Sequence, residues 1–122
     1  MIAGLGTDIV EISRIAHSME KKRFLQDYFG QEERAMLQDR GFPVESVAAN
    51  FAAKEAFAKS LGTGVRGFLL REVQVLRGDL GEVILQLDGT AAALAQTHGL
   101  TRFHVSVSHC REYAVATVIA ES

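Results

Sequence analysis

Hydrophobic and polar residues alternate along several short segments of the chain and recur at helical spacing in others. Alternation is clearest over residues 102–108, and apolar segments bounded by turn residues predict further strands at residues 2–7, 72–77, 82–87 and 113–120. Helices are predicted at residues 11–19, 24–29, 31–38, 44–61 and 89–98. The fourth helix is long and rich in Ala, and GTG at residues 62–64 closes it. No repeat or linker divides the chain, so residues 1–122 form one predicted domain.

The last predicted strand has almost no polar face. Residues 114–120 read AVATVIA, whereas an antiparallel strand with one face in water alternates apolar and polar side chains. The long helix can cover only one face of this strand. The second face is therefore covered either by a helix or by another subunit, and the residues alone support both alternatives.

Composition and charge exclude several classes of protein. The 122 residues are 48% hydrophobic and 23% charged, with 11 Gly and 1 Pro, which excludes a collagen-like or disordered chain. A net charge of -2 argues against a broad basic surface for nucleic acid, and the single cysteine, Cys110, leaves no intrachain disulfide. No segment has the roughly 18 apolar residues of a membrane span, and Asp8 interrupts any signal-peptide core. We expect a cytoplasmic protein with neither a membrane nor a nucleic-acid partner.

Asp8 follows the first predicted strand and admits two interpretations. A carboxylate fixed by a buried strand is well placed to bind a metal or to act as a general base. The spacing alone favours the other interpretation, in which Asp8 caps the helix that follows.

The long helix places Glu55 and Lys59 four residues apart. In this order the two side chains suit an ordinary surface ion pair. They also share a stripe of the helix with Phe51. Three alanines border that stripe: Ala48, Ala52 and Ala58. Small side chains there would leave room for a ligand, so an ion pair and a functional site are equal alternatives.

The loop after this helix contains Gly62, Gly64 and Gly67. Glycines let backbone amides approach an anion closely. The loop nevertheless follows the negative end of the helix dipole, which favours a helix cap with a turn. A phosphate bound here would need the positive charges of Lys59 and Arg66.

Positive charge gathers around the end of the first predicted helix. The basic residues are Arg14, Lys21, Lys22 and Arg23. Such a stretch is ordinarily a solvated helix face. It could also dock an acidic partner, because complementary charge speeds and orients association.

Three blocks of sequence occur in an order typical of one enzyme family. They are GTDIVEISRI at residues 6–15, FAAKEAFAKSLGTG at residues 51–64 and VSVSHCREYAVA at residues 105–116. Over essentially its whole length the chain thereby resembles the small bacterial phosphopantetheinyl transferases of the holo-acyl-carrier-protein synthase type. With the predicted elements, the resemblance implies a single α+β domain, a small antiparallel sheet packed on a long central helix plus shorter helices. It also implies a homotrimer with active sites between subunits, which would cover the second face of the last strand.

The family transfers 4′-phosphopantetheine from coenzyme A to a serine of apo acyl carrier protein, releases 3′,5′-ADP and serves fatty acid biosynthesis. The resemblance implies that Asp8 and Glu55 bind Mg²⁺, which prefers carboxylate oxygens. It implies that Lys59 lies against the phosphates. Glu55, directly or through a water on the metal, is then the expected base for the serine proton.

The resemblance also implies where the two substrates bind. The nucleotide part of coenzyme A would be held by Lys59, Gly62, Thr63, Gly64, Arg66 and His109. The acidic helix of the carrier protein would meet Arg14, Lys21, Lys22 and Arg23.

Two departures from the family pattern concern nucleotide binding and a turn. Asn50 stands where the family commonly has an Arg that contacts the nucleotide phosphate, so the 3′-phosphate would depend more on His109, Arg66 or Arg40. Residues 80–82 read LGE where a Gly-Lys-Pro turn is common.

The alternative to a transferase is a non-catalytic module that binds coenzyme A, a nucleotide or a carrier domain. The presence of both Asp8 and Glu55 favours the enzyme, because a docking module needs no paired metal ligands.

Overall fold

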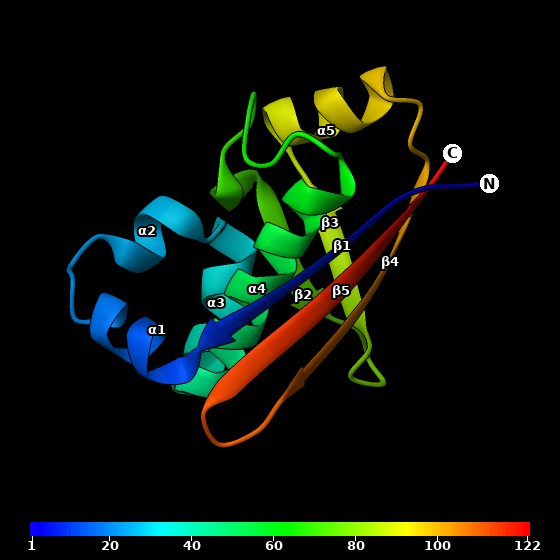
Figure 1. Cartoon of the computed structure of the whole chain (residues 1–122). Coiled ribbons are helices and arrows are strands. Elements are labelled where there is room, and N and C mark those ends of the chain that lie inside the picture. The colour runs from blue at the N-terminus through cyan, green and yellow to red at the C-terminus, as the bar shows by residue number, and fades with distance from the viewer.

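Five strands form two antiparallel sheets beside one long helix in the computed structural model, which describes residues 1–122 (Figure 1). The elements in chain order are β1 (Ile2–Glu11), α1 (Ile12–Met19), α2 (Phe24–Tyr28), α3 (Gln31–Asp39), α4 (Val44–Ser60), the 3₁₀ turn η1 (Leu70–Glu72), β2 (Val73–Arg77), β3 (Val83–Leu87), α5 (Gly89–Thr97), β4 (Arg102–His109) and β5 (Tyr113–Glu121). This arrangement confirms the predicted small α+β domain with antiparallel sheets on a long helix.

The larger sheet has the strand order β1-β5-β4, and β2 pairs with β3 in a separate hairpin. The last strand is therefore central in its sheet, with β1 and β4 on either side (Figure 1). The two termini lie side by side, and the Ser122 backbone N–H donates to the Met1 carbonyl at 2.9 Å. None of the helices combines the length and the apolar composition needed to cross a bilayer.

Strand β1 is longer than the sequence predicted. It pairs with β5 as far as Glu11, which lies opposite Tyr113. Asp8 is consequently inside the strand, and the residue that precedes the first turn of α1 is Glu11. The expectation that Asp8 caps a helix is wrong, because the β-sheet pairing continues past Asp8.

Two glycines let helix α4 lie close against β1. A Cβ atom on Gly6 would lie 2.7 Å from the Ser60 nitrogen, and one on Gly4 would lie 3.1 Å from the Ser60 carbonyl carbon. The first distance is too short for a real Cβ atom, and a Cβ on Gly4 would lie closer still to the Ser60 carbonyl oxygen, so only glycine permits this separation of strand and helix. Strand β1 thus runs antiparallel to α4, with Gly4 near the end of the helix.

The alanines of α4 are part of the core. Ala48, Ala52 and Ala58 are fully buried, so the expectation that they border an open ligand surface is wrong. Alanine favours the helical conformation, and its small side chain lets a sheet pack close to the helix. The close packing of the sheet accounts for the alanines of α4. The second core cluster mixes aliphatic side chains with Phe24 and Phe29, and most of it lies among α1, α2, α3 and the first turns of α4.

Helix α4 covers only one face of the larger sheet. On β5 the inward residues Ala114, Ala116, Val118 and Ala120 are buried against it. The outward face carries apolar side chains with no covering element, and Leu5 and Ile9 of β1 are 64% and 63% exposed. No helix of this chain covers the second face, which removes one of the two alternatives raised by the sequence.

Candidate active site

Asp8 of β1 and Glu55 and Lys59 of α4 meet where the strand crosses the helix. The Lys59 ammonium donates to Asp8 Oδ1 at 2.9 Å and to the Thr7 carbonyl at 3.0 Å. The Asp8 side chain is 16% exposed, whereas that of Lys59 is 53% exposed. Lys59 therefore pairs with Asp8, and the Glu55–Lys59 ion pair that the spacing allowed does not form.

Glu55 sits in an electrostatic environment that disfavours its charge. Burial raises the pKa of the Glu55 carboxyl, the nearby Asp8 carboxylate raises it further, and Lys59 opposes the shift. The carboxylates of Asp8 and Glu55 thus lie near each other in a partly buried site, and the Lys59 ammonium is the single positive charge that offsets them.

The donor set suits Mg²⁺. The ion prefers hard oxygen ligands and commonly takes one or two carboxylates, the rest coming from water and substrate phosphates. Asp8 and Glu55 supply two such carboxylates, and their mutual repulsion is a cost that a divalent cation would remove. No three or more His, Cys, Asp or Glu side chains are arranged so that they could hold a metal ion, so the chain offers no all-protein cage for a softer metal.

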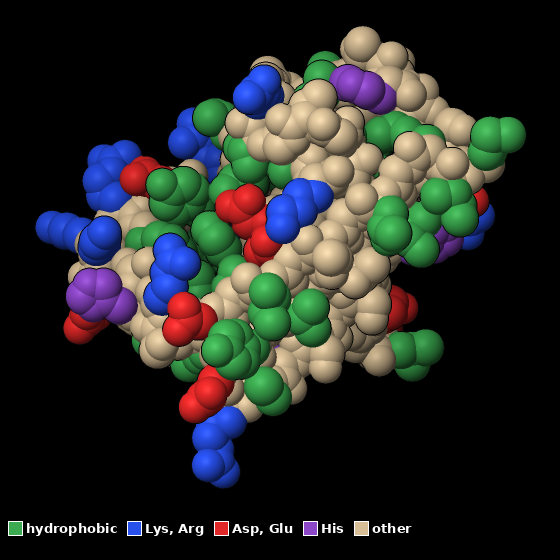
Figure 2. Space-filling view, viewed as in Figure 1, with side chains coloured by type: hydrophobic (Ala, Val, Ile, Leu, Met, Phe, Trp, Pro, Cys, Tyr) green, Lys and Arg blue, Asp and Glu red, His purple; other side chains and the backbone are tan.

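A cavity of about 460 Å³ opens beside Glu55. Its lining residues are Ser18, Lys21, Arg23, Phe24, Asp27, Tyr28, Phe51, Glu55 and Leu70. Figure 2 shows acidic and basic side chains meeting at the centre of this face, with Lys and Arg side chains gathered to the left over α1 and α2. The cavity thus joins one of the paired carboxylates to part of the basic stretch.

The basic residues do not form a single helix face, because α1 ends at Met19. Lys21 and Arg23 line the large cavity, and Arg23 pairs with Asp27 at 3.3 Å. Arg14 lines an adjoining hollow of about 100 Å³ with Phe24 and Phe51, and Lys22 lines neither.

These features match one family. The family model described as the 4′-phosphopantetheinyl transferase superfamily matches residues 4–118. The chain belongs to the 4′-phosphopantetheinyl transferase superfamily.

Similar proteins cover the chain almost completely. It is 46% identical over 123 residues to a holo-acyl-carrier-protein synthase of Photorhabdus laumondii, with 98% of each chain aligned. It is 42% identical to the protein of that name from Lachnoclostridium phytofermentans, over 99% of this chain and 97% of the other. The crystal structure of the Neisseria meningitidis holo-acyl-carrier-protein synthase has a TM-score of 0.93 at 34% identity, with both chains fully covered.

A further solved structure contains a ligand. The holo-acyl-carrier-protein synthase of Bacillus anthracis, in complex with CoA (3′,5′-ADP), has a TM-score of 0.82 at 33% identity. It aligns over 100% of this chain and 98% of its own.

Within one chain of this transferase, the glycine loop and His109, which are expected to bind the nucleotide, do not lie together. Gly62 and Gly64 follow α4 with φ of +80° and +70°, the left-handed geometry of a helix cap and turn, near the Gly4 end of β1. His109 lies beside Ala114, which faces Val10 near the other end of β1. Val10 comes six positions after Gly4 along the strand, or roughly 20 Å away. Thr63 and Arg66 are exposed in the glycine loop, whereas His109 lines a separate hollow of about 250 Å³.

Asn50 cannot contact a nucleotide in this transferase because its side chain is fully buried. Its amide donates to Glu33 Oε2 and to the Val75 carbonyl, both at 3.1 Å, and its oxygen accepts from Arg77 at 3.0 Å. The position that departs from the family's Arg thus belongs to the buried polar network of this chain.

Sequence reasoning missed the apolar wall of the cavity. Phe24 and Tyr28 are four residues apart on α2, and their rings face Phe51 at centroid distances of 6.0 and 6.2 Å. The spacing of the two aromatic residues was a usable signal. Leu70 carried none, because it reaches the cavity from the short turn η1.

Proposed function

We propose that this chain transfers 4′-phosphopantetheine from coenzyme A to a serine of apo acyl carrier protein, releasing 3′,5′-ADP, in fatty acid biosynthesis. The observation that carries the proposal is one cavity lined by Glu55, Lys21 and Arg23. The Asp8 carboxylate lies near Glu55 and completes the pair of acidic groups. Relatives named holo-acyl-carrier-protein synthase, and a similar structure in complex with CoA (3′,5′-ADP), support it.

Asp8 and Glu55 are the residues that would hold Mg²⁺. When bound, the ion neutralises charge on the pyrophosphate of coenzyme A. Lys59 adds a fixed positive charge at the same place, because Asp8 and the Thr7 carbonyl hold its ammonium.

In the proposed reaction the serine hydroxyl of the carrier protein attacks the phosphorus that bears the pantetheine arm. A bond forms between the serine oxygen and this phosphorus, and the bond from phosphorus to the bridging oxygen of 3′,5′-ADP breaks. The Glu55 carboxylate accepts the serine proton.

The carrier protein is proposed to dock over α1 and the turn after it. Its acidic helix would face the basic residues Arg14, Lys21, Lys22 and Arg23. Of these, Arg14 lines the hollow next to the cavity. Carrier docking on this surface would direct the serine toward Glu55 across the apolar wall.

A homotrimer is proposed as the working assembly. The outward sides of β1 and β5 carry exposed apolar side chains, among them Leu5, Ile9 and Val115, with no cover within the chain, which is characteristic of an interface. The roughly 20 Å between the His109 end and the Gly4 end of β1 is also long for both to contact the nucleotide part of one coenzyme A within one chain, which supports a contribution from a second copy. We propose a cytoplasmic location, consistent with the unpaired Cys110.

Mixed assemblies test the shared site. His109→Ala and Glu55→Ala subunits, each inactive alone, should regain activity when refolded together, because some interfaces then pair intact residues from two chains. No recovery in mixed assemblies, with assembly verified by sedimentation, would show that the site lies within one chain.

The proposed reaction is tested by incubating the protein with coenzyme A, Mg²⁺ and apo acyl carrier protein. The carrier should gain the mass of phosphopantetheine, and a metal chelator should prevent the gain. Coenzyme A binding without any mass gain on a panel of carriers would instead support the non-catalytic binding module.

A further inference from the structure

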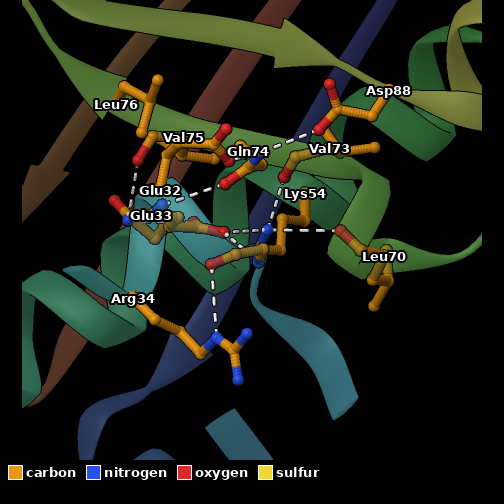
Figure 3. Close-up of polar contacts among 12 residues, drawn as sticks. Glu32, Glu33, Arg34, Lys54, Leu70, Val73, Gln74, Val75, Leu76 and Asp88 are labelled. Carbon is orange, nitrogen blue, oxygen red and sulfur yellow. Dashed lines mark hydrogen bonds and ion pairs between the residues drawn. The ribbon is translucent and has the colours of Figure 1, made fainter. Parts of the chain in front are cut away.

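Lys54 is a buried charge that the proposed reaction does not use. Its side chain and that of Glu33 are both fully buried, and the two pair at 2.6 Å between Lys54 Nζ and Glu33 Oε1. The same ammonium donates to the Leu70 carbonyl at 3.2 Å and to the Val73 carbonyl. Figure 3 shows the Lys54 nitrogen among these oxygens. All three N–H donors of the ammonium are therefore satisfied.

The partner carboxylate is held as firmly as the ammonium. Glu33 Oε1 also accepts from the Gly30 backbone N–H at 3.2 Å, and Oε2 accepts from the Asn50 amide at 3.1 Å. Burial raises the pKa of Glu33 and lowers that of Lys54, and the attraction between the two opposes both shifts. The ion pair thus has a single geometry, fixed from α3 and α4.

The Lys54 contacts connect this ion pair to the candidate active site. Leu70 lines the cavity together with Glu55, the residue that follows Lys54 on α4. The hydrogen bond from Lys54 to the Leu70 carbonyl is the only one between α4 and η1. The Lys54 ammonium therefore fixes the Leu70 backbone relative to α4, while the Leu70 side chain belongs to the core cluster that includes Ala56 and Phe57.

Stability alone does not account for a buried pair of this kind. Replacing a buried ion pair with apolar residues of similar volume is often neutral or stabilising, because both charges have lost their hydration. Apolar side chains cannot, however, hold two carbonyl oxygens at fixed positions.

We propose that Lys54, held by Glu33, is a positioning residue that fixes the Leu70 wall of the cavity against Glu55. This inference rests on the proposed transferase function. Misplacement of reacting groups by about 1 Å can reduce a rate by about a hundredfold. Carrier docking and coenzyme A binding use other residues, so the loss should appear in kcat and not in KM.

The test is the double variant Glu33→Leu with Lys54→Met, which removes both charges and keeps apolar volume. The variant should fold with an unfolding midpoint close to that of the wild type. Its kcat for transfer should fall about ten- to a hundredfold, with KM for carrier and coenzyme A within about twofold. Amide hydrogen exchange over residues 69–73 should be faster than in the wild type, and this measurement does not depend on activity.

Leu37→Ala is the matched control. Leu37 is a buried α3 residue that lines no cavity, so its loss should lower stability and leave kcat unchanged at temperatures where the variant is folded. Wild-type kcat and wild-type exchange in the double variant would overturn the positioning role.

Two other outcomes are also decisive. If the double variant does not fold, Glu33→Gln takes its place, because it keeps the shape and removes the charge that holds Lys54. A Glu33→Gln protein with unchanged kcat and exchange would overturn the proposal. If the wild type transfers nothing, the proposed function has failed, and the exchange data alone report whether the pair fixes this segment.

Discussion

Replacing Gly6 with alanine would test whether the close approach of β1 and α4 positions the active site. A Cβ atom there would lie 2.7 Å from the Ser60 nitrogen, 2.9 Å from the Ala56 carbonyl carbon and closer still to the Ala56 oxygen. These are helix backbone atoms that cannot rotate away. The strand would have to move outward by more than about 1 Å to restore ordinary contact near 3.5 Å, because the Ala56 oxygen is the nearest of these atoms.

The expected cost of Gly6→Ala is about 3 kcal/mol of unfolding free energy, at the upper end for added volume in a packed core. The same movement would stretch the 2.9 Å contact between Asp8 and Lys59, because Asp8 is two residues along the strand. Transferase activity should therefore fall by about a hundredfold, as expected for misplacement by about 1 Å.

Gly41→Ala is a matched control with a different physical cause. Gly41 has φ of +76°, and nothing lies within 4 Å of the position of its missing Cβ. The left-handed backbone should cost about 1 kcal/mol, and activity should be unchanged. Urea unfolding followed by circular dichroism, at one fixed protein concentration, gives the unfolding free energies of both variants. The transfer assay gives their activities. Equal losses of unfolding free energy in the two variants, or full transferase activity in Gly6→Ala, would refute the steric argument.

Three further predictions concern docking, acid stability and assembly. Reversing the charges of Arg14 and Lys21 together should raise KM for the carrier protein at low salt and leave KM for coenzyme A unchanged; a carrier KM that ignores ionic strength would place docking elsewhere. Burial raises the pKa of Glu72, but the hydrogen bonds that its carboxylate accepts outweigh burial and hold that pKa below its usual range. Glu72→Gln should thus cost about 0.5–2 kcal/mol at pH 7, and urea titrations should show the cost disappearing as the pH falls through the lowered pKa; a cost that grows in acid contradicts this. Val118→Glu should unfold the protein because Val118 is buried against α4, whereas Val115→Glu on the outward face should leave the subunit folded and break the proposed trimer in sedimentation; a folded Val118→Glu protein would show that this side of β5 is misassigned.

The sequence predicted most helices and strands because their hydrophobic periodicity is local. Helix α4 was predicted within a residue of its end, since an Ala-rich segment closed by GTG is a strong local signal. The extent of β1 could not be predicted in this way. Residues 8–11 are extended because they pair with β5, more than a hundred residues away in the chain.

The candidate site was only partly predictable for the same reason. The spacing of Glu55 and Lys59 on a helix was readable, but the partner of Lys59 depends on how β1 crosses α4. The alanines beside them suggested an open surface, and only Gly4 and Gly6 on the opposing strand explain why they are buried. No local pattern predicted that Lys54 is buried, because its partner comes from a different helix.

The most direct test of the central claim compares the wild type with Asp8→Ala and Glu55→Ala in transfer to apo acyl carrier protein. Each protein is incubated with coenzyme A and millimolar Mg²⁺, its fold is verified by circular dichroism, and the carrier is weighed by mass spectrometry. We predict the phosphopantetheine mass gain with the wild type and none with either folded variant, because each variant loses one of the two carboxylates that would hold Mg²⁺. Near-normal turnover by either variant would contradict the assignment of this pair.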